Sequence, residues 1–247
     1  LKEFDKYLIR TCGIQMNSAD NYHKVLKVLF NNAVIDEIID RSPYLGFEPL
    51  ETAVGKPKDT LTLSDVEAIR ELDLSSPELK HLDKTRKLFL FMINTGLRFS
   101  DVANARLENL RFVKLGNRSV PFIDILQKKT KNPVDVCLNR EAMNCLHFFR
   151  QIMDKNEPLL FGKMTLQPNN RNLKDIAKLA GLKKKLSTHV ARHSYATFLF
   201  NELEVPLEQV MGGLGHKKVT MTEHYIRNNN LKLVDKLDNL FVAKKVA

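Results

Sequence analysis

The 247-residue sequence lacks long apolar runs and has few cysteines, and each absence excludes a class of protein. No apolar stretch approaches the roughly 20 residues of a transmembrane helix, and the first residues do not resemble a signal peptide. The three cysteines, Cys12, Cys137 and Cys145, are odd in number and lack the spacing of zinc ligands. They favour a reducing compartment, so we expect a cytoplasmic protein without a zinc site. Because no apolar run is long enough to span a bilayer, we also expect no contact with a membrane.

Acidic side chains do not balance the basic ones, and the imbalance lies in the later part of the chain. The net charge is +10, from 39 Lys and Arg against 29 Asp and Glu. The first 60 residues carry 8 basic and 9 acidic side chains, so the remainder carries 31 basic and 20 acidic ones. A basic domain of this kind commonly binds a polyanion, and nucleic acid is the leading candidate. Charge alone is also compatible with a merely soluble basic protein.

The N-terminal part is predicted to be a small helical unit followed by a linker. Because the first residue is Leu rather than Met, we expect a fragment of a longer chain. Helical patterns cover residues 2–10 and a longer stretch from Asn17 or Ser18 to about residue 39. Pro and Gly are frequent between residues 43 and 60, which indicates a linker. We therefore expect two domains, 1–57 and 58–247. The apolar residues at helical spacing in the long helix are Tyr22, Val25, Leu26, Leu29, Phe30, Ala33 and Val34.

The second domain is predicted to be mostly helical. A capping box at 64–67 opens a helix to about residue 72, and Pro77 precedes the next helix. The apolar run 88–93 of that helix is expected to be buried, and Gly96 suits the left-handed position that ends it. Ser100 can cap a short helix after it. The expected helices after Gly96 are 101–107, 140–153 (capped by Asn139), 172–182, 189–203, 207–211 and 231–242.

Between residues 111 and 138 the pattern changes from helix to strand. Three short antiparallel strands are predicted at 112–115, 120–126 and 134–138, with turns at 116–117 and 131–133. The expected fold class is therefore mainly α with one small antiparallel β-sheet.

A candidate site lies at the start of the helix predicted after Thr188, its expected N-cap. His189 and Arg192 are three residues apart and leave one face of this helix together. A helix N-terminus, a guanidinium and an imidazole can bind a phosphate and move a proton. Most His-x-x-Arg pairs on helices have no such role. A metal site at His189 and His193 is weaker still, because Val190 stands where a metalloprotease has its catalytic Glu.

Five separated motifs together resemble the tyrosine recombinases, also called the phage integrase family. They are TGLRFSD at 95–101, KKT at 128–130, HVAR at 189–192, LGH at 214–216 and Tyr225 nine residues later. The segment GHKKVTMTEHY at 215–225 is similar to the family's nucleophile segment. The resemblance covers about residues 60–230 and implies the catalytic fold of DNA breaking-rejoining enzymes. Residues 1 to about 50 resemble the end of the helical, SAM-like core-binding domain that precedes it.

The resemblance implies a role for each motif. Two planar guanidinium groups, Arg98 and Arg192, can bind the non-bridging oxygens of a DNA phosphate, and Tyr225 is the nucleophile. His189 is assigned proton transfer and His216 phosphate contact. The departing 5′ hydroxyl needs a proton donor, for which a hairpin lysine is suited. Lys129, next to Thr130, is preferred over Lys128, although the choice stays open.

The remaining assignments concern support and DNA binding. Asp101 resembles the acid that supports the first arginine, and His193 is expected to pack or to form hydrogen bonds. The lysines expected to contact the DNA are Lys128, Lys131, Lys183, Lys184, Lys185 and Lys217.

The expected reaction forms a 3′-phosphotyrosine bond that a 5′ hydroxyl later attacks, and it requires no ATP, cofactor or metal. The resemblance implies double-stranded DNA at attachment sites as partner and a homotetramer in the synaptic complex, with a monomer expected for the isolated fragment. DNA-bending or directionality proteins can assist, and we expect association with the nucleoid. Within the family, the chain resembles integrases of bacterial mobile elements most, so we expect a role in integration or excision of such an element. Two other interpretations are a type IB topoisomerase and a catalytically silent DNA-binding module.

Overall fold

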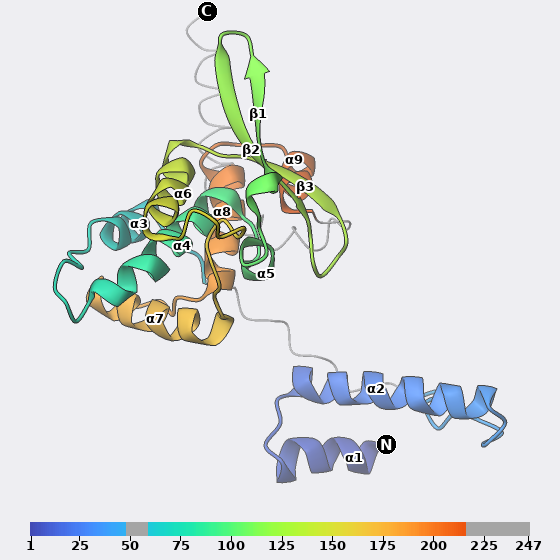
Figure 1. The fold of residues 1–247 in the computed structure, drawn as a ribbon. Helices are drawn as coiled ribbons and strands as arrows, with labels where there is room; N and C mark the ends of the chain where they lie inside the picture. The colour runs from blue at the N-terminus through green and yellow to red at the C-terminus, as the bar shows by residue number, and fades with distance from the viewer. Residues whose placement is uncertain (48–58, 216–247) are drawn as a thin grey trace, which may run out of the picture. The chain divides into compact units, whose positions relative to one another are not determined.

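The computed structural model describes residues 1–47 and 59–215 (Figure 1). The chain divides into two compact units, Leu1–Lys56 and Pro57–Ala247. The predicted helix at 231–242 lies outside the described residues.

The first unit contains one long helix and a short helical segment before it. Helix α1 is Lys2–Lys6, a π-helical turn (η1) follows at Tyr7–Thr11, and α2 is Met16–Ile35. The predicted cap of the long helix at Asn17 or Ser18 is wrong, because Gln15 in extended conformation precedes the first turn. The predicted end near residue 39 is also wrong, because Glu37 has a φ of 54° and the chain turns away there.

Three buried polar side chains, Asp5, His23 and Tyr44, form a hydrogen-bonded network in this unit. Nε2 of His23 lies 2.7 Å from Oδ1 of Asp5, and its Nδ1 lies 2.9 Å from the Tyr44 hydroxyl. All three side chains are buried, and Phe47 stacks on the His23 ring. Burial raises the pKa of Tyr44, and the Asp5 charge adds to that effect. Polar groups in a core are tolerated when they bond one another, and here the network joins α1, α2 and the segment after α2.

The apolar stripe predicted on α2 is only partly buried. Tyr22, Val25 and Leu29 are exposed, whereas Ala19 and His23 on the same helix are buried. Helix α2 therefore faces the rest of its unit with His23 and with the partly buried part of the stripe, including Phe30, whose ring lies 6.0 Å from that of Tyr44.

The second unit is built from helices and one three-stranded sheet (Figure 1). Within residues 1–47 and 59–215, no helix has the length and hydropathy to cross a bilayer. The helices of this unit are α3 (Leu63–Arg70), α4 (Lys80–Thr95), α5 (Phe99–Val102), the 3-10 turn η2 (Leu107–Asn109), α6 (Arg140–Ile152), α7 (Leu166–Leu179), α8 (Thr188–Asn201) and α9 (Leu207–Leu214).

Helix α4 is the centre of this unit, as its apolar run predicts. All six residues from Leu88 to Ile93 are buried, and α4 packs against α3, α6, α7 and α8. A helix that is apolar around its whole circumference must be covered on all sides. Gly96 ends the helix in the left-handed conformation, with a φ of 66°. The predicted stop is confirmed.

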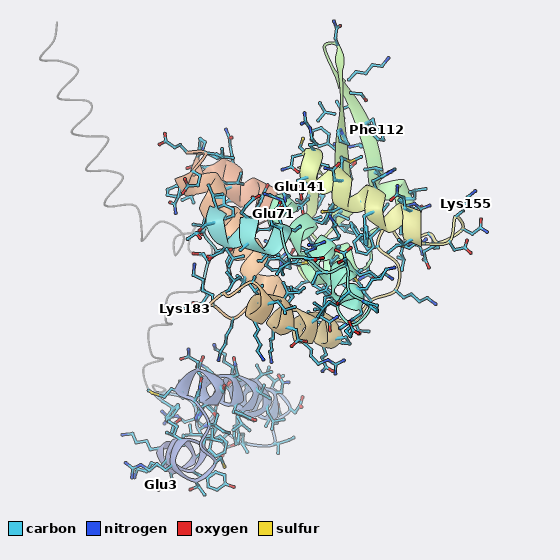
Figure 2. The ribbon with its side chains drawn as sticks, turned by 90° about the vertical axis from the view of Figure 1, so that its left-hand side faces the viewer. Glu3, Glu71, Phe112, Glu141, Lys155 and Lys183 are labelled. Atoms are coloured by element: carbon cyan, nitrogen blue, oxygen red, sulfur yellow. The ribbon has the colours of Figure 1, made fainter. Side chains whose placement is uncertain are left out.

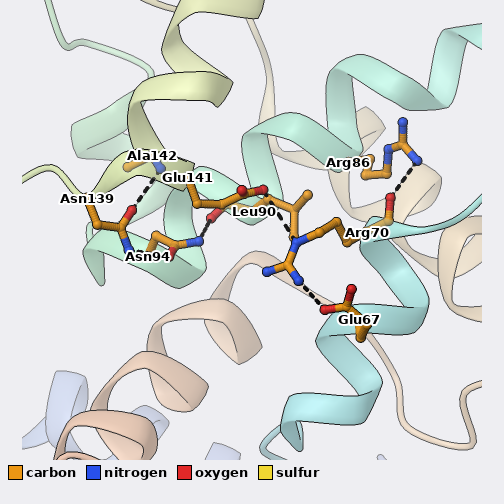
Figure 3. Close-up of polar contacts among 8 residues, drawn as sticks. All are labelled: Glu67, Arg70, Arg86, Leu90, Asn94, Asn139, Glu141 and Ala142. Atoms are coloured by element: carbon orange, nitrogen blue, oxygen red, sulfur yellow. Dashed lines mark hydrogen bonds and ion pairs between the residues drawn. The ribbon is translucent and has the colours of Figure 1, made fainter.

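Polar contacts link α3, α4 and α6 at one end of these helices (Figure 3). Arg70 of α3 forms ion pairs with Glu67 and with Glu141 of α6. The Asn139 side chain caps α6, as predicted, by accepting from the Ala142 amide at 2.8 Å. Its Nδ2 donates to Asn94 of α4 at 2.7 Å, so the cap also joins two helices.

Several predicted helix starts are wrong by a few residues. The capping box lies at Thr62 and Asp65 rather than at 64–67, so α3 begins at Leu63. Ser187, and not Thr188, is the N-cap residue of α8. Helix α7 begins six residues before the predicted Asn172, because Pro168 falls in its first turn, where a missing N–H costs nothing. Helix α5 begins at Phe99 and spans only four residues.

The three predicted strands form one antiparallel sheet. Strands β1 (Leu110–Leu115), β2 (Arg118–Leu126) and β3 (Pro133–Cys137) pair in the order β1-β2-β3. Figure 1 shows the β1–β2 hairpin projecting from the helical body, whereas β3 lies beside α9. The β2–β3 turn, residues 127–132, therefore emerges next to α5 and α9.

Candidate active site

The first predicted arginine follows the end of α4 directly. A Cβ at Gly96 would lie 2.3 Å from Cδ1 of Tyr195, so only glycine allows α8 to pack this closely. The chain then turns at once into α5, and Arg98 occupies the N-cap position of that helix. Its half-buried side chain donates from Nη1 to Oε1 of Gln127 at 2.5 Å. Arg98 is thereby directed to the end of β2.

The second predicted arginine is buried beneath the same region. Arg192 on α8 is only 5% exposed. Its Nη1 donates to the Gly96 carbonyl at 2.6 Å, and its Nη2 donates to the Leu214 carbonyl at 2.5 Å. A buried guanidinium is costly unless acceptors surround it, and two helix ends supply them here. Arg192 therefore joins the ends of α4 and α9.

His189 lies one turn before Arg192 and is exposed. Its ring is stacked on that of His193, with centroids 6.4 Å apart. Across residues 1–47 and 59–215, no group of three His, Cys, Asp or Glu side chains is close enough to hold a metal ion. All three cysteines are free thiols.

The β2–β3 turn carries the candidate lysines. It is closed by backbone bonds from Gln127 N to Asn132 O and from Lys131 N to Gln127 O, both 2.9 Å long. The side chains of Lys128, Lys129 and Lys131 are exposed. The turn thus presents three cations to solvent near Arg98.

Asp101 holds this turn from the side of α5. It is 2% exposed, and its Oδ1 accepts from the Lys128 amide at 3.0 Å. Its Oδ2 is buried and has no hydrogen-bond partner among the described residues. The carboxylate therefore bonds the backbone of the lysine turn, and the Asp101 amide donates to the Arg98 carbonyl at 2.9 Å.

One important residue has no counterpart in the sequence predictions. Gln127 is 0% exposed and contacts Arg98, Thr130 and Leu214 through its side-chain amide. The only sequence signal is a glutamine directly after the apolar end of a strand and before a lysine pair.

Gly215, which follows α9, lies against the lysine turn. Nδ2 of Asn132 donates to the Gly215 carbonyl at 3.1 Å. A Cβ at Gly215 would lie 2.7 Å from Val134 and 2.8 Å from Gln127, so the backbone passes the turn in direct contact. His216, Lys217 and Tyr225 lie outside the described residues. The last described residue is therefore adjacent to His216 in sequence and to the lysine turn in space.

A different tyrosine, Tyr195, lies close to Arg192 and to Gly96. Burial raises the pKa of Tyr195, and Cys137 adds to the increase, whereas the Arg192 charge acts in the opposite direction. A raised pKa keeps this phenol protonated and makes it a poor nucleophile.

The lysines before α8 differ from one another. Lys183, labelled in Figure 2, and Lys185 are exposed on the loop between α7 and α8. Lys184 instead pairs with Asp65 of α3, with Nζ 2.7 Å from Oδ2. Burial raises the pKa of Asp65, but hydrogen bonds from Lys184 and Thr62 outweigh it and hold this pKa below its ordinary value. Lys184 is thus held by a partner within the fold.

Comparison with known proteins places this arrangement in a family. Residues 60–232 match the model of the phage integrase family, and residues 1–49 match that of the phage integrase SAM-like domain. The tyrosine recombinase XerD of Listeria monocytogenes is 26% identical over 235 residues, which cover 90% of this chain and 75% of that protein.

Two solved structures share the fold. The XerH site-specific recombinase bound to difH DNA superimposes with a TM-score of 0.72 at 20% identity, covering 95% of this chain and 70% of that one. The Tn1549 transposon integrase bound to circular intermediate DNA gives a TM-score of 0.65 at 18% identity, covering 91% of this chain and 80% of that one. The predicted fold, mainly helical with a small antiparallel sheet, is confirmed. The chain belongs to the phage integrase family of tyrosine recombinases.

Proposed function

We propose that the protein is a site-specific DNA recombinase that cleaves and rejoins DNA strands through a 3′-phosphotyrosine intermediate. One observation carries this proposal. Arg98, Arg192 and the lysine turn are joined through Gln127 and the Leu214 carbonyl, directly before His216. Two guanidinium groups next to a hairpin lysine form a site for a phosphate whose oxygens gain charge in the transition state.

In the proposed cleavage step, the Tyr225 oxygen attacks the phosphorus and the bond to the 5′ oxygen breaks. The Tyr225 proton passes to His189, and Lys129 donates a proton to the departing 5′ oxygen. Arg98, Arg192 and His216 bind the non-bridging oxygens. The 5′ hydroxyl of a second strand then attacks the phosphotyrosine and restores the DNA linkage. Because this bond conserves the energy of the broken one, we expect no requirement for ATP, metal or cofactor.

We assign the proton donor to Lys129 rather than Lys128. The Lys128 amide is held by Asp101, so the orientation of the turn is set at that residue. Lys129 follows it at the exposed apex and precedes Thr130, which Gln127 holds. A Lys129→Met variant should lose cleavage, whereas Lys128→Met should mainly weaken DNA binding.

DNA binding is proposed for the exposed lysines of this domain. Lys128, Lys131, Lys183, Lys185 and Lys217 are the proposed contacts to the DNA backbone. Lys184 contributes less than we expected from sequence, since its ammonium group already pairs with Asp65.

The proposed domains are a core-binding domain, residues 1–57, and a catalytic domain, residues 58–247. The match of residues 1–49 to the phage integrase SAM-like domain supports the first. The likeness to a transposon integrase supports a role in integrating or excising a mobile element. We propose double-stranded attachment-site DNA as the partner and a synaptic homotetramer as the active assembly, in the cytoplasm at the nucleoid.

Covalent capture tests the proposal. The purified chain is incubated without magnesium with a library of nicked duplexes that carry a randomised central site, and adducts are isolated in denaturant. Wild type should form adducts that share a sequence, and Tyr225→Phe should form none while still binding DNA. Arg192→Lys should lower adduct formation by about 10²- to 10³-fold, because it removes oriented donors.

The matched control is Arg140→Lys, a change at an exposed arginine on α6, which should leave adduct formation unchanged. Absence of any wild-type adduct would contradict the proposal in favour of a silent DNA-binding module. With the captured sequence placed twice in one plasmid, a recombinase gives rearranged products, whereas a topoisomerase gives relaxation alone.

A further inference from the structure

Gln127 is a buried amide whose role the backbone of its own turn does not explain. It follows β2 and is 0% exposed. The turn is already closed by the bonds from Gln127 N to Asn132 O and from Lys131 N to Gln127 O. The side chain is therefore not required to close the turn, and its hydrogen bonds serve another purpose.

Those hydrogen bonds reach three different parts of the site. Oε1 accepts from Nη1 of Arg98 at 2.5 Å and from Oγ1 of Thr130 at 2.7 Å. Nε2 donates to the Leu214 carbonyl at 3.0 Å. Since a guanidinium only donates and a carbonyl only accepts, the orientation of the amide is determined by its partners.

The Leu214 carbonyl connects this amide with the second arginine. It accepts from Gln127 and also from Nη2 of Arg192 at 2.5 Å. Gly215 lies directly against the side-chain amide of Gln127. A Cβ at Gly215 would be 2.8 Å from both Oε1 and Nε2 of Gln127, so there is no room for a side chain. Arg98, the lysine turn and the end of α9 thus converge on one amide.

We propose that Gln127 is a positioning residue for strand cleavage, an inference that rests on the proposed function. Gln127 does not touch the DNA. It fixes the Arg98 guanidinium relative to Lys129 and to the backbone that leads into His216. Catalysis by oriented donors is sensitive to small displacements, so loss of this amide should slow cleavage without a matching loss of DNA affinity.

Two substitutions test this role. Gln127→Met keeps the length of the side chain and removes its hydrogen bonds. Gln127→Glu keeps both accepted bonds, from Arg98 and Thr130, and replaces the bond to Leu214 by a repulsive contact between two acceptor oxygens. The matched control is Gln151→Met at an exposed glutamine on α6.

Each variant is measured on the nicked duplex that wild type captures most efficiently. Single-turnover cleavage at saturating protein gives the rate, binding in the Tyr225→Phe background gives the affinity, and thermal unfolding checks the fold. We expect Gln127→Met to cleave on the order of 10- to 100-fold more slowly, with affinity within about twofold of wild type. Gln127→Glu should recover part of the lost rate, and Gln151→Met should match wild type.

The outcomes separate this inference from the proposed function. If wild type forms adducts and Gln127→Met cleaves at the wild-type rate, the positioning role is refuted and the proposed function stands. The role is also refuted if Gln127→Met and Gln127→Glu lose affinity, fold and cleavage in proportion, because the amide then only supports the fold. If Gln127→Met alone fails to fold, Gln127→Glu decides: slower cleavage at wild-type affinity supports the role, and an unaltered rate without the bond to Leu214 refutes the link from Arg98 to the end of α9 through this amide. Absence of wild-type adduct refutes both proposals.

Discussion

Single residues in this site serve the fold and the proposed chemistry together. Arg192 is the main example, since its guanidinium bonds the carbonyls that end α4 and α9. Helix ends leave carbonyls without intrahelical partners, and a buried donor that satisfies two of them stabilises the packing. The same contacts hold the guanidinium in one orientation before any phosphate arrives.

Gly96 provides a stability test at this scale. Gly96→Ala introduces a left-handed alanine, which costs roughly 1–2 kcal/mol, and its Cβ would overlap Tyr195, which costs about 1–3 kcal/mol more. Urea denaturation should give a free energy of unfolding lowered by both contributions. The control is Gly181→Ala, where φ is also +66° but nothing lies within 4 Å of the new Cβ. Equal losses for the two variants would contradict the close packing of α8 on α4.

At the scale of elements, contacts between segments distant in sequence shape the site. The pair of Lys184 and Asp65 joins the loop before α8 to the first turn of α3. Ser194 on α8 likewise accepts from the Leu61 amide at 2.9 Å. The helix that carries His189 and Arg192 is thereby attached to the beginning of its own domain.

The Lys184–Asp65 pair predicts a pH dependence. The folded-state pKa of Asp65 lies below its ordinary value of 3.8, so its contribution to stability is complete above that pH and is lost as the pH falls through the folded value. Lys184→Met should raise the folded-state pKa and reduce the acid-induced loss. An NMR titration of the Asp65 carboxyl measures this pKa. Lys183→Met is the control, and an unchanged pKa in Lys184→Met would contradict the pairing.

Short sequence patterns predicted which helices and strands are present. They predicted less well where each helix begins and ends, and they did not predict contacts between distant segments. Asn139 as a cap, Gly96 as a stop and the apolar run of α4 are properties of short segments, so the sequence alone was sufficient for them. The predicted start of α7 at Asn172 is wrong, since the helix begins at Leu166 and Pro168 fits its first turn. Gln127 and Lys184 have partners up to 119 residues away, and no periodicity indicates such contacts.

The first unit provides a second test at this scale. Tyr44→Phe removes the hydroxyl that bonds His23 and leaves a buried ring nitrogen without that partner, at a cost of about 1–3 kcal/mol. Amide hydrogen exchange in the full chain should show faster exchange in α1 and α2. Tyr22→Phe, at an exposed tyrosine of the same unit, should leave exchange unchanged. Equal protection in both variants would show that the buried network does not stabilise this unit.

At the scale of the whole molecule, the excess of basic residues lies in the same part of the chain as the match to the phage integrase family. The basic excess lies after residue 60, and nearly all of it falls within residues 60–232, the segment that matches the phage integrase model. We therefore expect DNA affinity to depend on salt mainly through the proposed catalytic domain. The Arg98 and Arg192 side chains and the Lys128 amide form hydrogen bonds with groups of this same unit.

The most direct measurement identifies the residue that becomes attached to DNA. Wild-type adduct is digested with nuclease and trypsin, and mass spectrometry locates the remaining nucleotide on the peptide. The chain has 5 tyrosines, and we predict that the phosphate is bonded to Tyr225. Attachment to Tyr195, the tyrosine beside Gly96, or to any residue other than Tyr225 would contradict the account.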